Sequence, residues 1–275
     1  MINKITQENY NIQTYNVHGL KVSVFDDIDL SNYIVAVINQ SNKIICYGYS
    51  FGSIPFFKEY PQMAKYPNTF DISVCDGRWF FWFCKFRGYK MKSALSIPDM
   101  VQLVLNLANR NKYSVMILGS TVDNNNLATN NLKRLYPDVN VLEGYDGGFF
   151  TEQDCIKSVE IINQRKPDIL LIGVSLPKKE SFAYNYKKQL RTKVIIPFGG
   201  YVDILSGKSM KMPTVIKKLG LAFLYRFIQE PRRFFKDGIL NPLESILILL
   251  PHVIFWGNKF SFPKYYHKSE DFPIL

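Results

Sequence analysis

Carboxylates and glycines stand at the ends of apolar segments, where they could take part in a reaction. Asp76 follows the apolar segment at 70–75 and precedes Gly77, and Asp203 follows the glycine pair at 199–200. A carboxylate at a strand end can accept the proton of a hydroxyl nucleophile or bind sugar hydroxyls. Each aspartate alone could also be an ordinary turn residue. The surrounding pattern therefore has to decide between the two interpretations.

Residues that bind metals are sparse. The four cysteines, at positions 46, 75, 84 and 155, form no CxxC pair, and the three histidines lie far apart. This spacing predicts buried free thiols rather than a metal site. The acidic cluster at 26–29 is the nearest approach to a DxD-type metal motif, and we interpret it as a solvated turn. We expect no metal and no other cofactor.

From residue 113 onward, strand-like apolar runs alternate with helical patterns. The runs lie at 114–119, 139–144, 168–175 and 193–200, and the candidate helices at 124–135, 152–165 and 179–190. This alternation predicts an α/β fold, with a Rossmann-like, mostly parallel sheet covered by helices on both faces. Ligands of such sheets bind at the carboxyl ends of the strands, so the site should form there.

The first part of the chain is less regular. Candidate strands lie at 20–25, 33–39 and 70–75. Residues 1–15 are polar and lack the apolar core of a secretory signal, which favours a cytoplasmic location. We expect one α/β domain over residues 1–212 and an appendage over 213–275.

The C-terminal part is basic. The net charge of the chain is +11, and residues 207–236 contain eight lysines and arginines against one glutamate. Apolar residues at near-helical spacing from 216 to 227 predict a basic amphipathic helix ended by Pro231. The apolar stretch at 239–256 is interrupted by prolines and a glutamate, so we expect it to lie on a membrane rather than to span one.

Several motifs recur in a characteristic order: INQSN at 38–42, CDG at 75–77, DGGFF at 146–150, KPDILLIGVSLPKKE at 166–180, FGGYVDILSGKSMKMP at 198–213 and LYRFIQEPRRFF at 224–235. In this order, from about residue 38 to 236, the sequence resembles the WecG/TagA/CpsF glycosyltransferases. The resemblance implies a metal-independent, inverting transfer of a sugar such as N-acetylmannosamine. The donor would be a UDP-sugar, and the acceptor a polyprenyl-diphosphate-linked sugar at the inner face of the cell membrane.

The resemblance also implies roles for single residues. Asp76 would be the general base, and Asn39 would hold substrate hydroxyls, although an asparagine bonded to its own backbone fits that position equally well. The implied donor-binding residues are Phe149, Lys179, Gly199, Gly200, Asp203, Arg226, Arg233 and Lys236. Among them, Asp203 would bind the ribose and the three basic appendage residues the diphosphate. A core aromatic is the alternative for Phe149, and a solvated basic face is the alternative for the appendage.

Three features depart from the family pattern. Lys179 replaces a glutamine, Ala94 stands where an arginine is usual, and residues 79–92 are unusually aromatic and basic. A second hypothesis is therefore a catalytically impaired, membrane-associated partner in polysaccharide assembly. The basic charge alone would also fit nucleic acid, but no RRM, KH or helix-turn-helix pattern is present, and no G-x-G-x-x-G follows a first strand. Self-association into a homo-oligomer stays open.

Overall fold

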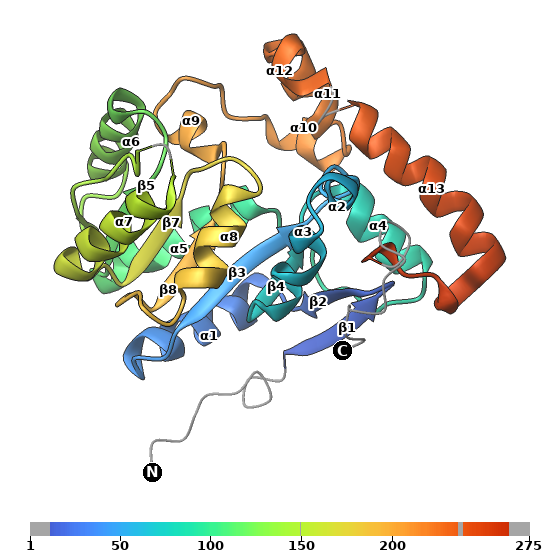
Figure 1. The fold of residues 1–275 in the computed structure, drawn as a ribbon, viewed down its shortest axis with the longest axis horizontal. Helices are drawn as coiled ribbons and strands as arrows, with labels where there is room; N and C mark the ends of the chain where they lie inside the picture. The colour runs from blue at the N-terminus through green and yellow to red at the C-terminus, as the bar shows by residue number, and fades with distance from the viewer. Residues whose placement is uncertain (1–11, 149, 236–238, 264–275) are drawn as a thin grey trace.

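The computed structural model describes residues 12–148, 150–235 and 239–263. Its centre is a six-stranded parallel sheet of order β4-β3-β8-β7-β5-β6 (Figure 1). The strands are β3 (Ile44–Tyr49), β4 (Ile72–Cys75), β5 (Ser114–Leu118), β6 (Asn140–Val141), β7 (Ile169–Ile172) and β8 (Val194–Pro197). An antiparallel hairpin, β1 (Gln13–Val17) and β2 (Leu20–Val24), packs beside β4. The predicted α/β class is confirmed.

Helices cover both faces of the sheet and continue into a C-terminal group (Figure 1). They are α1 (Asp27–Asn39), α2 (Phe56–Glu59), α3 (Gln62–Lys65), α4 (Arg78–Phe86), α5 (Ile97–Asn111), α6 (Val122–Leu135), α7 (Glu152–Arg165), α8 (Lys178–Tyr186), α9 (Tyr201–Leu205), α10 (Thr214–Lys218), α11 (Ala222–Gln229), α12 (Pro231–Phe235) and α13 (Asn241–Trp256). Within the described residues, none of these helices combines the length and the apolar character needed to span a membrane.

Alternate side chains of each strand pack into two separate cores, because neighbouring residues of a strand point to opposite faces. Ile117 and Leu171 face α1, α5, α6 and α9, whereas Met116 and Leu170 face α4, α7, α8 and the hairpin. The strands are therefore buried on both sides, as parallel sheets normally are.

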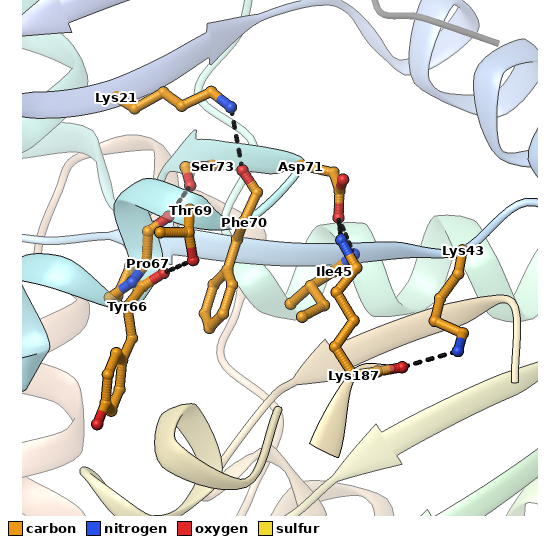
Figure 2. Close-up of polar contacts among 10 residues, drawn as sticks. All are labelled: Lys21, Lys43, Ile45, Tyr66, Pro67, Thr69, Phe70, Asp71, Ser73 and Lys187. Atoms are coloured by element: carbon orange, nitrogen blue, oxygen red, sulfur yellow. Dashed lines mark hydrogen bonds and ion pairs between the residues drawn. The ribbon is translucent and has the colours of Figure 1, made fainter. Parts of the chain in front are cut away.

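Polar contacts at the starts of β3 and β4 attach the end of α8 to the sheet (Figure 2). The Asp71 carboxylate accepts hydrogen bonds from the Ile45 amide and the Lys187 ammonium, both at 2.7 Å, and Lys43 donates to the Lys187 carbonyl at 2.7 Å. Burial lowers the pKa of Lys43, and the neighbouring Lys187 charge lowers it further. These contacts lie at the amino ends of the strands, opposite to the edge where ligands of such sheets bind.

The predicted strand at 33–39 is wrong. These residues belong to α1, whose N-cap Asp26 accepts from the amides of Ile28 and Asp29. The buried residues recur at the helical spacing 30, 33, 34, 37 and 38. The acidic cluster at 26–29 is thus the start of a helix rather than a turn. The strand β3, at 44–49, which lies between β4 and β8, had not been predicted.

The predicted single amphipathic helix between 216 and 230 is divided into α10 and α11. Gly220 separates them with a φ of +75°, and a Cβ there would lie 3.1 Å from the Trp82 ring. A residue other than glycine would meet both backbone strain and this ring. Cys46, Cys75 and Cys84 are buried free thiols, as predicted, and Cys155 is half-buried.

Candidate active site

The loops that follow β4, β5, β7 and β8 converge at the carboxyl edge of the sheet. The amide of Gly119 donates to the Tyr145 carbonyl, the amide of Gly173 to the Leu118 carbonyl, and the amide of Gly199 to the Ile172 carbonyl, at 2.7 to 3.0 Å. A Cβ at Gly119 would lie 2.4 Å from Val174, and φ there is +105°. The glycine allows two strand-end loops to approach each other closely.

Asp76 lies at this edge, directly after β4. Its amide donates to the Tyr49 carbonyl at 2.8 Å, and its Oδ1 accepts from the Ile97 amide at 3.3 Å. Gly77, with a φ of +89°, then turns the chain into α4. The carboxyl is thus held between the end of β4 and the start of α5.

The charges around Asp76 come from two parts of the chain. Burial raises the pKa of Asp76, and Arg226, the Ile97 amide and Lys217 lower it in part, while Asp99 raises it. A raised pKa makes the carboxylate a stronger base than an exposed aspartate. Arg226 lies on α11 and Lys217 on α10, so the C-terminal helices reach the vicinity of this carboxyl.

Two further contacts fix the C-terminal helices to this edge. Lys217 forms an ion pair with Asp99 in the first turn of α5, and the Trp79 indole donates to the Gly220 carbonyl at 2.9 Å. The first contact joins α10 to α5, and the second joins the α10–α11 turn to α4. Arg226 therefore belongs to a segment that is attached on both sides of Asp76.

A buried ion pair lies under the loop after β8. Lys179 pairs with Glu180, whose side chain is fully buried. The Lys179 ammonium also lies 5.8 Å from the centre of the Tyr47 ring, and a Cβ at Gly199 would lie 3.3 Å from its Cε. Burial, and next the Glu180 charge, raise the pKa of Tyr47. Gly199, with a φ of +59°, thus leaves room for the lysine.

A cavity of about 300 Å³ opens at the ends of β5 and β7. Its lining residues are Ser120, Asp146, Gly148, Phe150, Gly173, Val174, Ser175 and Lys178. The lining contains two hydroxyls, a carboxylate, an ammonium group and an aromatic ring. This combination can bind hydroxyls, a phosphate and a flat ring system.

Asp203 is buried behind the cavity rather than being part of its lining. Its Oδ1 accepts from the Asn124 side-chain amide at 2.9 Å, and the same amide donates to the Ser120 hydroxyl at 2.7 Å. Ser120, which has a φ of +72°, is part of the lining. The carboxylate thus reaches the cavity through two intervening side chains.

Comparison of the sequence with known proteins shows the family of the chain. The sequence profile of the glycosyl transferase WecG/TagA/CpsF family matches residues 15–255. This chain belongs to that family. Two proteins named N-acetylglucosaminyldiphosphoundecaprenol N-acetyl-beta-D-mannosaminyltransferase, from Staphylococcus aureus (strain MRSA252) and Bacillus subtilis (strain 168), are each 24% identical to it. The matches cover 59% and 58% of this chain and 62% and 61% of those proteins. The chain thus matches about three fifths of the length of these relatives.

Five of the ten candidate site residues of this WecG/TagA/CpsF sequence come together at the carboxyl edge of the sheet. Asp76, Lys179, Gly199 and Arg226 do so directly, and Asp203 does so through Asn124. Gly200 is the N-cap of α9, the helix that contains Asp203.

Asn39 does not belong to this group. It is the exposed last residue of α1, and the chain continues from it into the start of β3. It therefore lies at the amino edge of the sheet, because the predicted strand that would have ended at Asn39 is a helix. Arg233 belongs to α12, and Phe149 and Lys236 lie outside the described residues.

The polar lining of the cavity was not anticipated from the sequence. Asp146 was noticed only within the DGGFF motif and Ser175 and Lys178 only within the motif at 166–180, and Ser120 belonged to no motif. A usable signal existed, since each of them lies at the end of a predicted strand or a few residues after it. The rule that ligands bind at strand ends would have selected them.

Proposed function

We propose that this chain is an inverting glycosyltransferase that uses a UDP-sugar donor and a polyprenyl-diphosphate-linked sugar acceptor. The observation that carries the proposal is the half-buried Asp76 carboxyl at a strand end, which lies close enough to Arg226 for the arginine charge to lower its pKa. Family membership supports the reaction class. The printed name of the relatives, with its diphosphoundecaprenol-linked sugar, supports the acceptor class.

The proposed chemistry is a single displacement. The acceptor hydroxyl oxygen forms a bond to the anomeric carbon of the donor sugar, while the bond from that carbon to the diphosphate oxygen breaks. Asp76 takes the hydroxyl proton, and the electron pair of the broken bond leaves with UDP. Attack from the face opposite to the diphosphate inverts the anomeric centre. A positioned base of this kind contributes about 10²–10⁴-fold to the rate.

The cavity at the ends of β5 and β7 is proposed to hold the nucleoside of the donor. The Phe150 ring offers a surface for the base, and the Ser120 and Ser175 hydroxyls and the Asp146 carboxylate offer partners for ribose hydroxyls. Asp203 then has an indirect role, because it orients Ser120 through Asn124. This replaces the direct contact with the ribose that the sequence predicted.

The diphosphate is proposed to meet basic side chains and therefore to need no metal ion. Lys178 in the cavity lining and Arg226 on α11 can donate charge-assisted hydrogen bonds to phosphate oxygens. Such groups stabilise the negative charge that develops on the leaving group. We propose the same role for Arg233 and Lys236, on their place in the family motif.

The C-terminal helices are proposed to hold the enzyme peripherally on the inner face of the membrane. Val215, Leu224 and Ile228 on α10 and α11 are exposed. Residues 207–236 around them have a net charge of +7, from eight basic residues and one acidic residue. Anionic lipid attracts each basic residue near its surface by about 1 kcal/mol. A polyprenyl-linked acceptor would be reached there.

A product assay tests this function. The full chain is incubated with a panel of UDP-sugars and a lipid-diphosphate-linked N-acetylglucosamine, with and without EDTA, and a disaccharide is sought by mass spectrometry. A product with an inverted anomeric centre that forms equally in EDTA is the expected result. UDP binding without product from any donor would favour an impaired partner protein. No UDP binding at all would refute the assignment of the donor site.

A further inference from the structure

Helix α4 is apolar on both of its faces. Phe80, Phe81 and Cys84 are buried in the core, whereas Trp79, Trp82 and Phe86 on the other face are 44%, 41% and 84% exposed. The exposed residues are three and four positions apart, so they form one stripe along the helix. A helix that borders only water normally places polar residues on that face.

Basic residues accompany this stripe. Residues 77–98 contain five lysines and arginines and no aspartate or glutamate. Lys85 and Lys90 are exposed, and the Lys85 ammonium lies 5.6 Å from the centre of the Phe81 ring. The surface therefore combines exposed aromatic rings with positive charge.

The exposed stripe of α4 continues into the C-terminal helices, which lie at the same end of the molecule (Figure 1). Trp79 is bonded to Gly220 between α10 and α11. On the other side, the Ser245 hydroxyl of α13 donates to the Phe51 carbonyl, and the Phe51 ring contacts Phe80 of α4. Helix α4 is thus hydrogen-bonded to the α10–α11 turn and is linked to α13 through Phe51.

Helix α13 also presents an apolar stripe to the exterior. Leu243, Leu247 and Phe255 are 49%, 62% and 82% exposed, and Trp256 beside them is 64% exposed. Trp79, Trp82 and Trp256 are all the tryptophans of the chain, and each of them is exposed on α4 or α13. Tryptophan is enriched where proteins meet the headgroup region of a bilayer, because its ring is apolar and its N–H is polar.

We propose that α4 is a second membrane-contacting element, whose stripe of Trp79, Trp82 and Phe86 enters the headgroup region of an anionic bilayer beside the C-terminal helices. This inference rests on the proposed membrane association of the enzyme. The aromatic rings supply the apolar contact, and the basic residues supply the attraction to anionic lipid.

A contact between α4 and the membrane would also set the distance between the proposed base, Asp76, and the lipid headgroups. Asp76 lies two residues before the first residue of α4, and the helix of nine residues is about 14 Å long. An α4 that rests on the bilayer therefore holds the proposed base within about one helix length of the lipid headgroups. The sugar of a polyprenyl-diphosphate acceptor projects from the membrane into this zone.

A second copy of the chain fits this surface less well than lipid does. A symmetric dimer would place the same surface of each subunit against the other. Residues 77–98 contain five basic residues, of which Lys92 pairs with Asp29, so a symmetric contact would bring like charges together, which is unfavourable. An anionic bilayer instead complements the charge.

Vesicle binding of the full chain tests the proposal. The variant W82Q/F86Q removes two exposed rings of α4, of which the Trp82 ring lies close to Gly220, and it keeps Trp79, which donates to the Gly220 carbonyl. The matched control L135Q/I156Q removes two side chains that are 60% and 48% exposed on α6 and α7, which lie away from α4 (Figure 1). Partition into vesicles of phosphatidylglycerol and phosphatidylethanolamine should fall at least about tenfold in the α4 variant only.

Fluorescence quenching locates the contact without disrupting it. Vesicles with brominated acyl chains should quench the tryptophan emission of the full chain, and Trp82→Phe should reduce the quenched fraction while it keeps an aromatic ring. Trp256→Phe serves as a second reporter, on α13. An unchanged quenched fraction in Trp82→Phe, or unchanged partition of W82Q/F86Q, would overturn the proposal.

Two controls separate this inference from its alternatives. Activity of W82Q/F86Q on a short-chain, water-soluble acceptor should equal that of the parent, because α4 acts through the membrane. If neither the parent nor any variant has transferase activity but W82Q/F86Q still partitions less into vesicles than the parent, the proposed function is wrong and the membrane contact of α4 is supported. If W82Q/F86Q converts a dimer into a monomer in sedimentation velocity while vesicle binding is unchanged, the surface is an interface between copies and the lipid proposal is wrong.

Discussion

Replacing Asp76 by asparagine tests the proposed base with little change in shape. The asparagine oxygen can still accept the hydrogen bond from the Ile97 amide, now 3.3 Å from Oδ1. Only the ability to take a proton is lost. We expect turnover to fall by about 10²–10⁴-fold, which is about 3–5.5 kcal/mol of activation free energy.

Asp76→Asn should decrease turnover without decreasing the free energy of unfolding. Burial raises the folded-state pKa of Asp76 above its value in the unfolded chain. The ionised carboxylate is therefore disfavoured by folding, and the free energy of unfolding is reduced as pH rises through that range. A neutral asparagine removes this penalty, so the variant should be at least as stable as the parent at neutral pH. A loss of activity in a protein of undiminished stability cannot then be attributed to unfolding.

The assay measures product formation under saturating donor and acceptor, together with UDP affinity by calorimetry and unfolding by denaturant. In the parent, turnover should rise with pH through the Asp76 pKa, at a midpoint above the ordinary 3.8, because the base must be ionised. Asp138→Asn, an exposed change in the loop before β6, is the control. Turnover of Asp76→Asn within a few-fold of the parent would remove Asp76 from the mechanism.

Two further changes test residues that support the site, and a third tests the turn between β1 and β2. Asp203→Ala should weaken UDP binding by about 1–3 kcal/mol in calorimetry, because Asn124 loses its acceptor and no longer orients Ser120. Lys179→Met should lower the free energy of unfolding by about 3–5 kcal/mol in denaturant titrations, since the buried Glu180 carboxylate loses its cation. In that turn, His18 Nδ1 lies 3.0 Å from the Phe260 carbonyl oxygen. Burial lowers the pKa of His18 from its ordinary 6.5, so protonation of this histidine opposes folding, and the free energy of unfolding decreases as pH falls below 6.5. His18→Phe should flatten that decrease in denaturant titrations at a series of pH values.

The sheet could be predicted where the chain alternates regularly. The runs that became β5, β7 and β8 are buried along their whole length, and the first two are followed by the predicted helical segments at 124–135 and 179–190. The failure at 33–39 has a physical reason. The segment YIVAVIN is apolar and β-branched, but the spacing of Leu30, Tyr33, Ile34, Val37 and Ile38 is helical, and the N-cap at Asp26 was interpreted as a turn. The helical spacing of the apolar residues and the Asp26 N-cap together outweigh the preference of β-branched residues for strands in this segment.

The site could be predicted only in part, because its residues come from distant segments. Asp76 was identified since a strand-end carboxylate is visible within a short motif. The role of Asp203 was harder to infer, because its hydrogen bond to Asn124 joins residues 79 positions apart. Asn39 was misplaced by a single error of element type, since a residue that ends a helix before a parallel strand lies at the opposite edge from one that ends a strand.

The lysine that replaces the usual glutamine has a local explanation that bears on the whole site. Lys179 is paired with the fully buried Glu180, and the pair together is neutral. A buried carboxylate needs such a partner, so the charge of Lys179 is largely engaged within the fold. The positive charge available to a leaving diphosphate must then come from elsewhere at the edge. Lys178 and Arg226 are the described candidates, and Arg226 belongs to the C-terminal helices that Lys217 and Trp79 attach to the domain. The part of this stabilisation that Arg226 is proposed to supply should therefore be lost when the appendage is detached.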